Sequence, residues 1–178
     1  MKRLARLFTL LLLIAALGLA ALWLRPVPVP LHPPPMPILG SIDHILIEKA
    51  ARRMQLFQNG QPVRSYRIAL GFAPTGDKVA QGDGRTPEGR FTITRRNDQS
   101  AYHLSLGLDY PQPDDLIRAA AGGYGPGGDI FIHGQPNALP DGFIVKGDWT
   151  AGCIALTNLE MQEVWAATPT GTPVEIRP

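Results

Sequence analysis

The sequence has little of several residue types on which common protein functions depend. Its 178 residues include one cysteine, Cys153, and four histidines that are scattered along the chain. A single cysteine cannot form a disulfide within the chain. One thiol and four separated imidazoles lack the spacing that is typical of a metal site. We therefore expect no metal ion and no other cofactor.

Positive charge is also scarce once the N-terminus is set aside. The formal net charge is +2, but residues 1–40 contain four basic and no acidic side chains. Residues 41–178 consequently hold 13 basic and 15 acidic groups. A nucleic-acid-binding domain needs a basic surface, so we exclude nucleic acid as a partner.

The N-terminus contains a long uncharged run. Three basic residues precede the 18 uncharged residues 7–24, and Arg25 follows them. A basic start and an apolar helix of this length are typical of a signal peptide or membrane anchor whose N-terminus stays in the cytoplasm. We interpret residues 1–25 as such a segment. The rest of the chain would then be exported to the periplasm or cell envelope, with the inner membrane as a partner if residues 7–24 are retained as an anchor.

A proline-rich linker, residues 26–40, separates this segment from the body of the chain. Seven of the residues from Arg25 to Pro37 are proline, which favours an extended polyproline II spacer. Residues 41–178 remain as one domain that is long enough to bury a core.

The pattern of residues 41–178 predicts a mainly β domain with one or two short helices. Alternating or short apolar segments predict strands at 42–48, 54–58, 61–70, 91–94, 102–106, 130–132 and 172–176. Asn59-Gly60 is a strong hairpin signal, and residues 71–84 are typical of a long loop. These features favour a β-sandwich or barrel.

Two segments carry helix signals. Asp114 and Asp115 suit the first turn of a helix over residues 113–121. Thr157 and Glu160 form a capping-box pattern before a helix over 159–167. We expect Leu159, Val164 and Trp165 to lie on the core side of this second helix.

Cys153 and His133 are the candidate catalytic pair. An apolar segment ends in His133-Gly134, and Cys153 follows Gly152 shortly before the second helix. A thiol with a neighbouring imidazole is the minimum for nucleophilic catalysis. In an exported chain a lone cysteine forms an intermolecular disulfide, is a reactive thiol or is an inert core residue, and the histidine favours a reactive thiol. We expect His133 and the helix N-terminus to lower the pKa of Cys153.

These residues also carry a resemblance to a known family. His133-Gly134 followed by Thr150-Ala151-Gly152-Cys153 resembles the signature of the YkuD-type L,D-transpeptidases, His-Gly followed after a gap by Ser/Thr-x-Gly-Cys. The segments 84–89 and 171–176 resemble further parts of that family, so the similarity spans residues 41–178.

The resemblance implies a YkuD-like β-sandwich that acts on peptidoglycan stem peptides. In that family the cysteine attacks a tetrapeptide stem at the bond between diaminopimelate and D-Ala, and D-Ala leaves. The acyl group then passes to an amine, usually the diaminopimelate side chain of a second stem, which gives a 3–3 cross-link.

By this resemblance Cys153 is the nucleophile, His133 is its base, and the carbonyl of Gly134 orients the imidazole. We expect Gly152 to let the backbone turn so that amide N–H groups, including that of Cys153, face the developing oxyanion.

Five further residues are candidates for substrate binding, namely Thr150, Trp149, Asp148, Arg85 and His103. Thr150 suits a hydrogen bond that holds the turn better than a chemical role, and His103 suits a structural role on its strand. Asp148 and Trp149 fit the lining of a cleft and the packing of the loop equally well. Arg85 and Lys146 are suited to bind a stem carboxylate, although most such side chains are simply solvated.

Two positions depart from the family pattern. Ala151 stands where the family usually has histidine, and Ala155 where it usually has arginine or asparagine. Because these positions order the site or hold substrate, a peptidoglycan hydrolase or amidase of the same fold remains an alternative to a transpeptidase. A non-catalytic wall-binding module is a third interpretation, which the presence of Cys153 and His133 disfavours.

Overall fold

The computed structural model describes residues 37–140 and 142–178. The predicted apolar helix and most of the proline-rich linker lie outside the described residues, so these remain predictions. Within the described ranges no helix is both long and apolar enough to cross a membrane.

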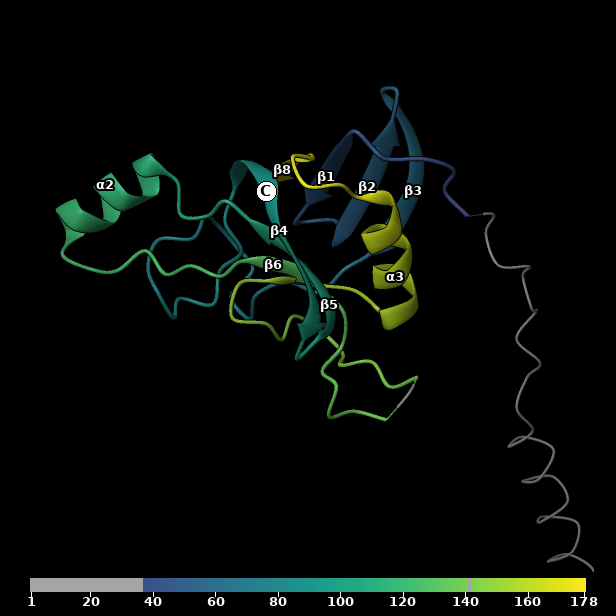
Figure 1. Ribbon diagram of the computed structural model, residues 1–178. Coiled ribbons are helices and arrows are strands. Elements are labelled where there is room, and N and C mark those ends of the chain that lie inside the picture. The colour runs from purple at the N-terminus through teal and green to yellow at the C-terminus, as the bar shows by residue number, and fades with distance from the viewer. Residues whose placement is uncertain (1–36, 141) are drawn as a thin grey trace, which may run out of the picture. The chain divides into compact units, whose positions relative to one another are not determined.

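The described chain forms eight strands and two short helices (Figure 1). In chain order these are β1 (His44–Glu48), β2 (Arg53–Gln58), β3 (Gln61–Arg67), β4 (Gly89–Ser100), β5 (His103–Leu108), α2 (Pro113–Gly122), β6 (Phe131–His133), β7 (Ile154–Ala155), α3 (Asn158–Ala167) and β8 (Pro173–Arg177). The strands lie in one sheet in the order β3-β2-β1-β8-β4-β5-β6-β7. The pairs β1–β8 and β6–β7 are parallel, and the other pairs are antiparallel.

The chain that follows β3, at one edge of the sheet, pairs with β7 at the other edge. Ala69 donates its N–H to the carbonyl of Ala155 in β7 at 2.9 Å and accepts the N–H of Ala155 at 2.8 Å. A second bridge joins Gly71 to Thr150. The sheet therefore curls until its first and last strands are linked, which confirms the predicted mainly β architecture.

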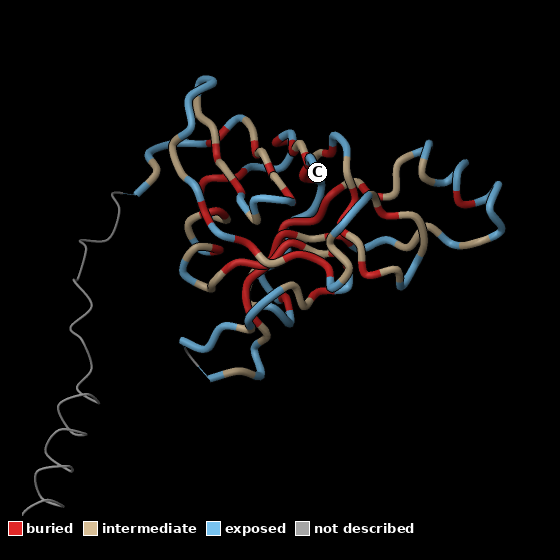
Figure 2. Tube along the Cα trace, turned by 180° about the vertical axis from the view of Figure 1, so that it is seen from behind, coloured by how far each residue is buried: buried red, intermediate tan, exposed pale blue. Residues whose placement is uncertain are grey.

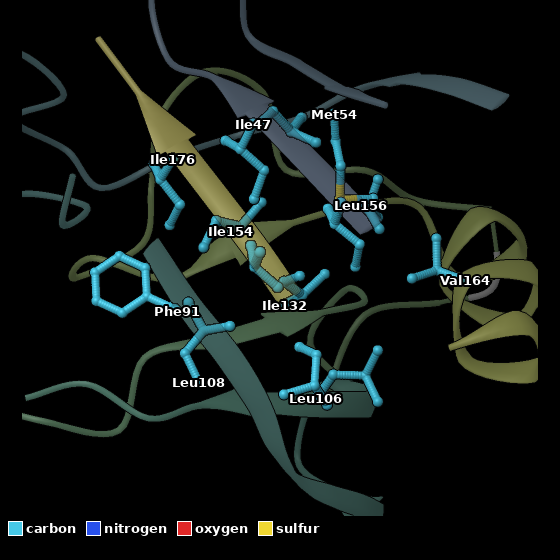
Figure 3. Close-up of a cluster of buried hydrophobic side chains, with 14 of the residues drawn as sticks. Ile47, Met54, Phe91, Leu106, Leu108, Ile132, Ile154, Leu156, Val164 and Ile176 are labelled. Atoms are coloured by element: carbon cyan, nitrogen blue, oxygen red, sulfur yellow. The ribbon is translucent and has the colours of Figure 1, made fainter. Parts of the chain in front are cut away.

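Hydrophobic side chains fill the interior of the curled sheet (Figure 3). The backbone segments that carry them are among the buried parts of the trace (Figure 2). Strands β1, β2 and β8 bury alternate residues there, as period-two strands with one core face do. The largest fully buried side chains are Ile45, Ile47, Met54, Leu56, Leu70, Ile93, Leu106, Leu108, Ile132, Ile154, Leu156 and Met161. Ile132 and Ile154 are neighbours in register on β6 and β7, so the core holds the strand that ends in His133 beside the strand that follows Cys153.

Strand β4 is much longer than the expected 91–94, and the two-residue strand β7 was not expected. The extra part of β4 includes the exposed polar stretch 95–99, which has no apolar alternation to mark it. Pairing with β5 extends it into a hairpin arm. The other predicted strands are confirmed, with ends that differ by one to three residues.

Helix α3 begins with the predicted capping box. The Thr157 hydroxyl accepts the Glu160 N–H at 3.2 Å, and the Glu160 carboxylate accepts the Thr157 N–H at 3.0 Å. The prediction that Leu159 faces the core is wrong, because its side chain is 78% exposed. Residues 161, 164 and 167 form the buried face instead, and a helical period of 3.6 residues turns Leu159 away from them.

Helix α2 follows the prediction for residues 113–121 and extends one residue further. Asp115 accepts the N–H of Gln112 at 2.9 Å and so closes the first turn. Gly123, with φ of 71°, ends the helix in the left-handed conformation that glycine adopts without strain.

Candidate active site

The fold brings Cys153 and His133 to one cavity. His133 is the last residue of β6, and Cys153 immediately precedes β7, the strand that pairs in parallel with β6. Both residues line a cavity of about 550 Å³, together with Tyr102, Trp149 and Thr150 among others. We refer to it as the Cys153 cavity. Two adjacent strand ends therefore present a thiol and an imidazole to the same space.

The position of His133 determines which nitrogen can act as a base. Its side chain is only 4% exposed, and Nδ1 lies 2.7 Å from the carbonyl oxygen of Gly134. A carbonyl can only accept, so Nδ1 carries the proton and the lone pair of the neutral ring lies on Nε2. As expected, the Gly134 carbonyl orients the imidazole and leaves Nε2 as the proton acceptor.

Two aromatic rings flank this imidazole. The Tyr102 ring centroid lies 4.6 Å from that of His133, and the Trp149 centroid lies 5.6 Å away in an edge-on arrangement. Burial lowers the pKa of His133. Sequence reasoning missed Tyr102, since a tyrosine at a hairpin tip gives no signal that its ring folds back over a histidine.

Trp149 lines the Cys153 cavity, which places it at the cleft rather than merely in the packing of its loop. Its indole Nε1 is buried and has no hydrogen-bond partner within the described residues.

The turn that presents Cys153 is held by Thr150. The Thr150 hydroxyl donates to the carbonyl of Cys153 at 2.7 Å and accepts the N–H of Gly152 at 3.1 Å. The predicted structural role of Thr150 is thus confirmed, and its contact with substrate remains a prediction. Because the Gly152 amide is already bonded, the amide of Cys153 is the better candidate to face an oxyanion.

Gly152 has no room for a side chain. Its φ is +138°, a conformation that is essentially reserved for glycine, and a Cβ atom there would lie 2.7 Å from the carbonyl oxygen of Arg85. The predicted turn at Gly152 therefore has two causes, the backbone conformation and the close approach of the 84–89 segment.

The expectation that the surroundings lower the pKa of Cys153 is wrong. The sulfur accepts the N–H of Phe131 at 3.4 Å, and the thiol donates to the carbonyl of Asp129 at 3.5 Å. Burial raises the pKa of the Cys153 thiol, and the Phe131 amide offsets this only in part. Burial thus favours the uncharged form of both groups, because it raises the pKa of the Cys153 thiol and lowers the pKa of the His133 imidazole.

Asp148 and Arg85 are engaged with other parts of the protein. The Asp148 carboxylate pairs with Arg52 at 2.8 Å and accepts the N–H of Leu70 at 3.0 Å, and it does not line the Cys153 cavity. The Arg85 guanidinium donates to the carbonyl of Asp77 at 3.2 Å. Asp148 thus ties the loop before Cys153 to Arg52, just before β2, and to the chain that follows β3. Arg85 approaches the site through its backbone carbonyl at Gly152.

His103 lies at the start of β5 with a positive φ of 67°. Its Nε2 is 3.0 Å from Nε2 of Gln162 in α3, and its N–H donates to Asn137 at 2.8 Å. These contacts suit the predicted structural role on the strand. His103 is not among the residues that line the Cys153 cavity.

Lys49, a buried lysine that sequence reasoning missed, holds the loop between β3 and β4 through hydrogen bonds to Gly76, Thr86 and Glu88. Lys49 is 2% exposed, and its ammonium donates to the carbonyls of Gly76 and Thr86 and to the carboxylate of Glu88 at 2.6 to 2.8 Å. The Thr86 hydroxyl in turn accepts the N–H of Gly71 at 3.1 Å. No feature of the sequence distinguishes Lys49 from an ordinary solvated lysine at the end of a strand.

The two alanines that depart from the family pattern occupy different surroundings. Ala151 is exposed and lines the Cys153 cavity. Ala155 is buried in β7, where it lies opposite His133 and pairs with Ala69. Among the described residues no group of three or more histidine, cysteine or acidic side chains is arranged to hold a metal ion.

Comparison with known proteins adds a family and relatives of the same fold. The profile of the YkuD family, described as the L,D-transpeptidase catalytic domain, matches residues 42–176. YafK of Escherichia coli strain K12, whose name marks it as a candidate L,D-transpeptidase, is 26% identical over 134 residues, which cover 72% of this chain and 48% of YafK.

Solved structures are similar to the chain as well. The helical cell shape determining protein Pgp2 of Campylobacter jejuni is 25% identical with a TM-score of 0.61, over 78% of this chain and 48% of Pgp2. Bd1075 of Bdellovibrio bacteriovorus is 23% identical with a TM-score of 0.55, over 78% of this chain and 48% of Bd1075. The chain thus spans about half the length of these relatives.

Proposed function

The chain belongs to the YkuD family of L,D-transpeptidase catalytic domains, and on this premise we propose that it is a thiol-dependent enzyme that modifies peptidoglycan. Its substrate would be the tetrapeptide stem. Cys153 would attack the carbonyl between diaminopimelate and D-Ala, and the acyl group would pass to an amine to form or exchange a cross-link.

The observation that supports this function best is the geometry of His133. Its Nδ1 proton is fixed on the Gly134 carbonyl, so the lone pair of Nε2 is available in the cavity that Cys153 also lines. A buried neutral imidazole in this tautomer suits a general base, and a raised thiol pKa means that the base is needed.

In the first half of the proposed reaction, Nε2 of His133 takes the proton from the Cys153 thiol as sulfur attacks the stem carbonyl. A C–S bond forms, and negative charge develops on the carbonyl oxygen. The amide of Cys153 is the donor we assign to that oxygen, and one such donor typically contributes about 3–4 kcal/mol. The imidazolium then protonates the departing amine, the C–N bond breaks, and D-Ala leaves behind a thioester.

In the second half an amine attacks the thioester while Nε2 takes a proton from it. A new C–N bond forms, the C–S bond breaks, and the proton returns to sulfur. If water attacks instead, the product is a shortened stem with a free carboxylate. Ala151, which lines the cavity without a polar side chain, keeps this hydrolytic outcome as the second candidate.

The proposed location follows from the N-terminus. A signal peptide or anchor in residues 1–25 and a proline-rich spacer in 26–40 would hold the domain outside the inner membrane, where peptidoglycan lies.

The proposal is tested by incubating the full-length protein with tetrapeptide-stem muropeptides, with and without an acceptor amine, and analysing the products by mass spectrometry. Release of D-Ala with a cross-linked product supports transpeptidation, and release of D-Ala with only a shortened stem supports hydrolysis. No release of D-Ala, or release that persists in a Cys153→Ala variant, would contradict the proposed thiol mechanism.

A further inference from the structure

A second hollow lies beside the Cys153 cavity. It has a volume of about 810 Å³ and is lined in part by residues 144–148 and 155–157. Residues 149–151 and Cys153 line the Cys153 cavity. The chain passes from one hollow to the other between Asp148 and Trp149 and returns after Cys153. The segment that contains Cys153 therefore joins the stretches of chain that line the second hollow, which we call the groove.

Two cationic side chains from distant segments line this groove. Arg67 is the last residue of β3, and Lys146 lies in the loop that leads to Trp149. Both side chains are exposed, and neither forms a hydrogen bond or ion pair with any residue in the ranges 37–140 and 142–178. The fold thus brings two like charges to one hollow without a counter-charge on either.

The other charged groups that line the groove are already engaged. Arg52 and Asp148 pair with each other at 2.8 Å. The Glu160 carboxylate accepts both the N–H and the hydroxyl of Thr157 in the capping box. The five charged groups sum to +1, and the positive charge that remains available belongs to Arg67 and Lys146.

The lining of the groove also has an aliphatic part. Ile144 lines it and is 53% exposed, and Val145 and Ile68 line it as well. The exposed Ile144 next to two unpaired cations suits a ligand that has small apolar side chains and carboxylates. A guanidinium binds a carboxylate in a planar, bidentate fashion, and an ammonium adds a mobile point charge.

We propose that the groove binds a carboxylate-bearing peptide, held by Arg67 and Lys146, with Ile144 against its aliphatic side chains. Only the choice of peptide rests on the proposed function, since a peptidoglycan stem carries several carboxylates and alanine methyl groups. The carboxylate role expected for Arg85 would fall to Arg67, because Arg85 lines neither hollow.

The test uses the full-length protein with Cys153→Ala, so that no turnover occurs. The probe is the stem tetrapeptide L-Ala-γ-D-Glu-meso-diaminopimelyl-D-Ala, compared with the same peptide amidated at its carboxylates. Backbone amide shifts of Val145 and Gly147 report on the groove, and those of Ala151 report on the Cys153 cavity. The variants are Arg67→Ala, Lys146→Ala and both together. Arg90→Ala, an exposed arginine on β4 that does not line the groove, is the matched control.

We expect the double variant to raise the Kd measured at Val145 and Gly147 about tenfold, which corresponds to about 1.4 kcal/mol. Amidation of the peptide should raise the Kd by a similar factor, and Arg90→Ala should leave the Kd unchanged. An unchanged Kd in the double variant, the absence of shifts at Val145 and Gly147, or equal binding of inorganic phosphate would each overturn the proposal.

These outcomes are separate from those of the turnover assay. If the protein releases no D-Ala but binds the peptide through Arg67, the proposed reaction is contradicted and the assignment of the groove stands. If the protein releases D-Ala and its peptide binding does not depend on Arg67 and Lys146, the assignment of the groove is contradicted and the proposed reaction stands.

Discussion

The ring of Tyr102 lies over the imidazole of His133, with 4.6 Å between centroids and 38° between planes. The backbone carbonyl of the same tyrosine accepts the N–H of Gly134 at 3.0 Å. The tip of the β4–β5 hairpin thus covers the proposed base with a side chain and fixes the following residue with its backbone. Through this one residue the hairpin can affect both the hydration and the orientation of the base.

Removing the Tyr102 ring should shift the titration of His133. Burial keeps the pKa of His133 below its ordinary value, so the neutral form persists as the pH falls. In Tyr102→Ala water reaches the ring and the pKa rises, which moves the acid limb of kcat/KM to higher pH. Tyr102→Phe keeps the ring and should leave the acid limb in place. NMR titration of the His133 ring protons measures the pKa without any need for turnover.

Tyr124→Ala is the control for this experiment, because Tyr124 lies between α2 and β6 and does not line the Cys153 cavity. A His133 pKa that is the same in Tyr102→Ala and the parent protein would show that the ring does not shield the imidazole.

The reactivity of Cys153 should follow its raised pKa. Burial favours the protonated thiol, so alkylation by iodoacetamide at neutral pH should be slower than that of N-acetylcysteine. The alkylation rate should rise only when the pH exceeds the ordinary pKa of a thiol. Mass spectrometry of the full-length protein across a pH series gives this profile. Fast alkylation that is already constant at neutral pH would instead indicate a thiolate–imidazolium pair in the resting enzyme.

Gly152→Ala should impair both stability and activity. The added Cβ would meet the Arg85 carbonyl at 2.7 Å, and a non-glycine residue at φ of +138° is strained by about 1–3 kcal/mol. Relief of this contact must move the turn that holds Cys153, so we expect kcat/KM to fall at least about tenfold. Denaturant unfolding and steady-state kinetics measure the two effects.

Gly60→Ala separates backbone strain from steric contact. Gly60 has φ of +72°, and no atom lies within 4 Å of an added Cβ. This variant should lose about 1 kcal/mol of stability and keep its activity. Equal kinetic losses in the two variants would show that the close approach of Arg85 is unimportant.

The sequence predicted those parts of the site that depend on local pattern. The His133-Gly134 and Gly152-Cys153 motifs follow from residue order alone, and the hairpin at Asn59-Gly60 follows from turn preference. Thr157 and Glu160 marked the start of α3 to within a residue because a capping box is a contact between near neighbours.

The sequence could not predict contacts that depend on the closed sheet. The direction of the pKa shift at Cys153 was missed because burial outweighs partners that sequence spacing suggests. Tyr102 and Lys49 carry no local signal, since each acts on segments more than twenty residues away. The side of α3 that contains Leu159 was misjudged because the helix has almost equal hydrophobicity around its circumference.

Substitutions on α3 should distinguish its two sides. Val164 is fully buried, so Val164→Ala should lower the free energy of unfolding by about 1–3 kcal/mol. Leu159 is largely exposed, so Leu159→Ala should change it by less than about 0.5 kcal/mol although it removes the larger side chain. Urea unfolding of the two variants is the measurement, and a larger cost at Leu159 would contradict the observed orientation of the helix.

Lys49→Met should destabilise the loop that supports the cysteine turn. The ammonium of Lys49 satisfies two carbonyls and the Glu88 carboxylate in a site that is almost closed to water. Its loss leaves these groups unpaired, so we expect a cost of about 2–4 kcal/mol. Because the Thr86 segment also supplies the Arg85 carbonyl that packs on Gly152, kcat/KM should fall even under conditions where the variant is fully folded.

Arg53→Met is the matched control for Lys49→Met, since Arg53 also pairs with a carboxylate, that of Glu48 at 2.6 Å, but is half exposed. Solvent screening limits such a pair to about 1 kcal/mol or less, so the control should lose little stability and no activity. If Lys49→Met costs no more than Arg53→Met, the loop does not depend on the buried ammonium. If it lowers stability but leaves kcat/KM unchanged in the folded protein, the loop supports the fold without positioning Cys153.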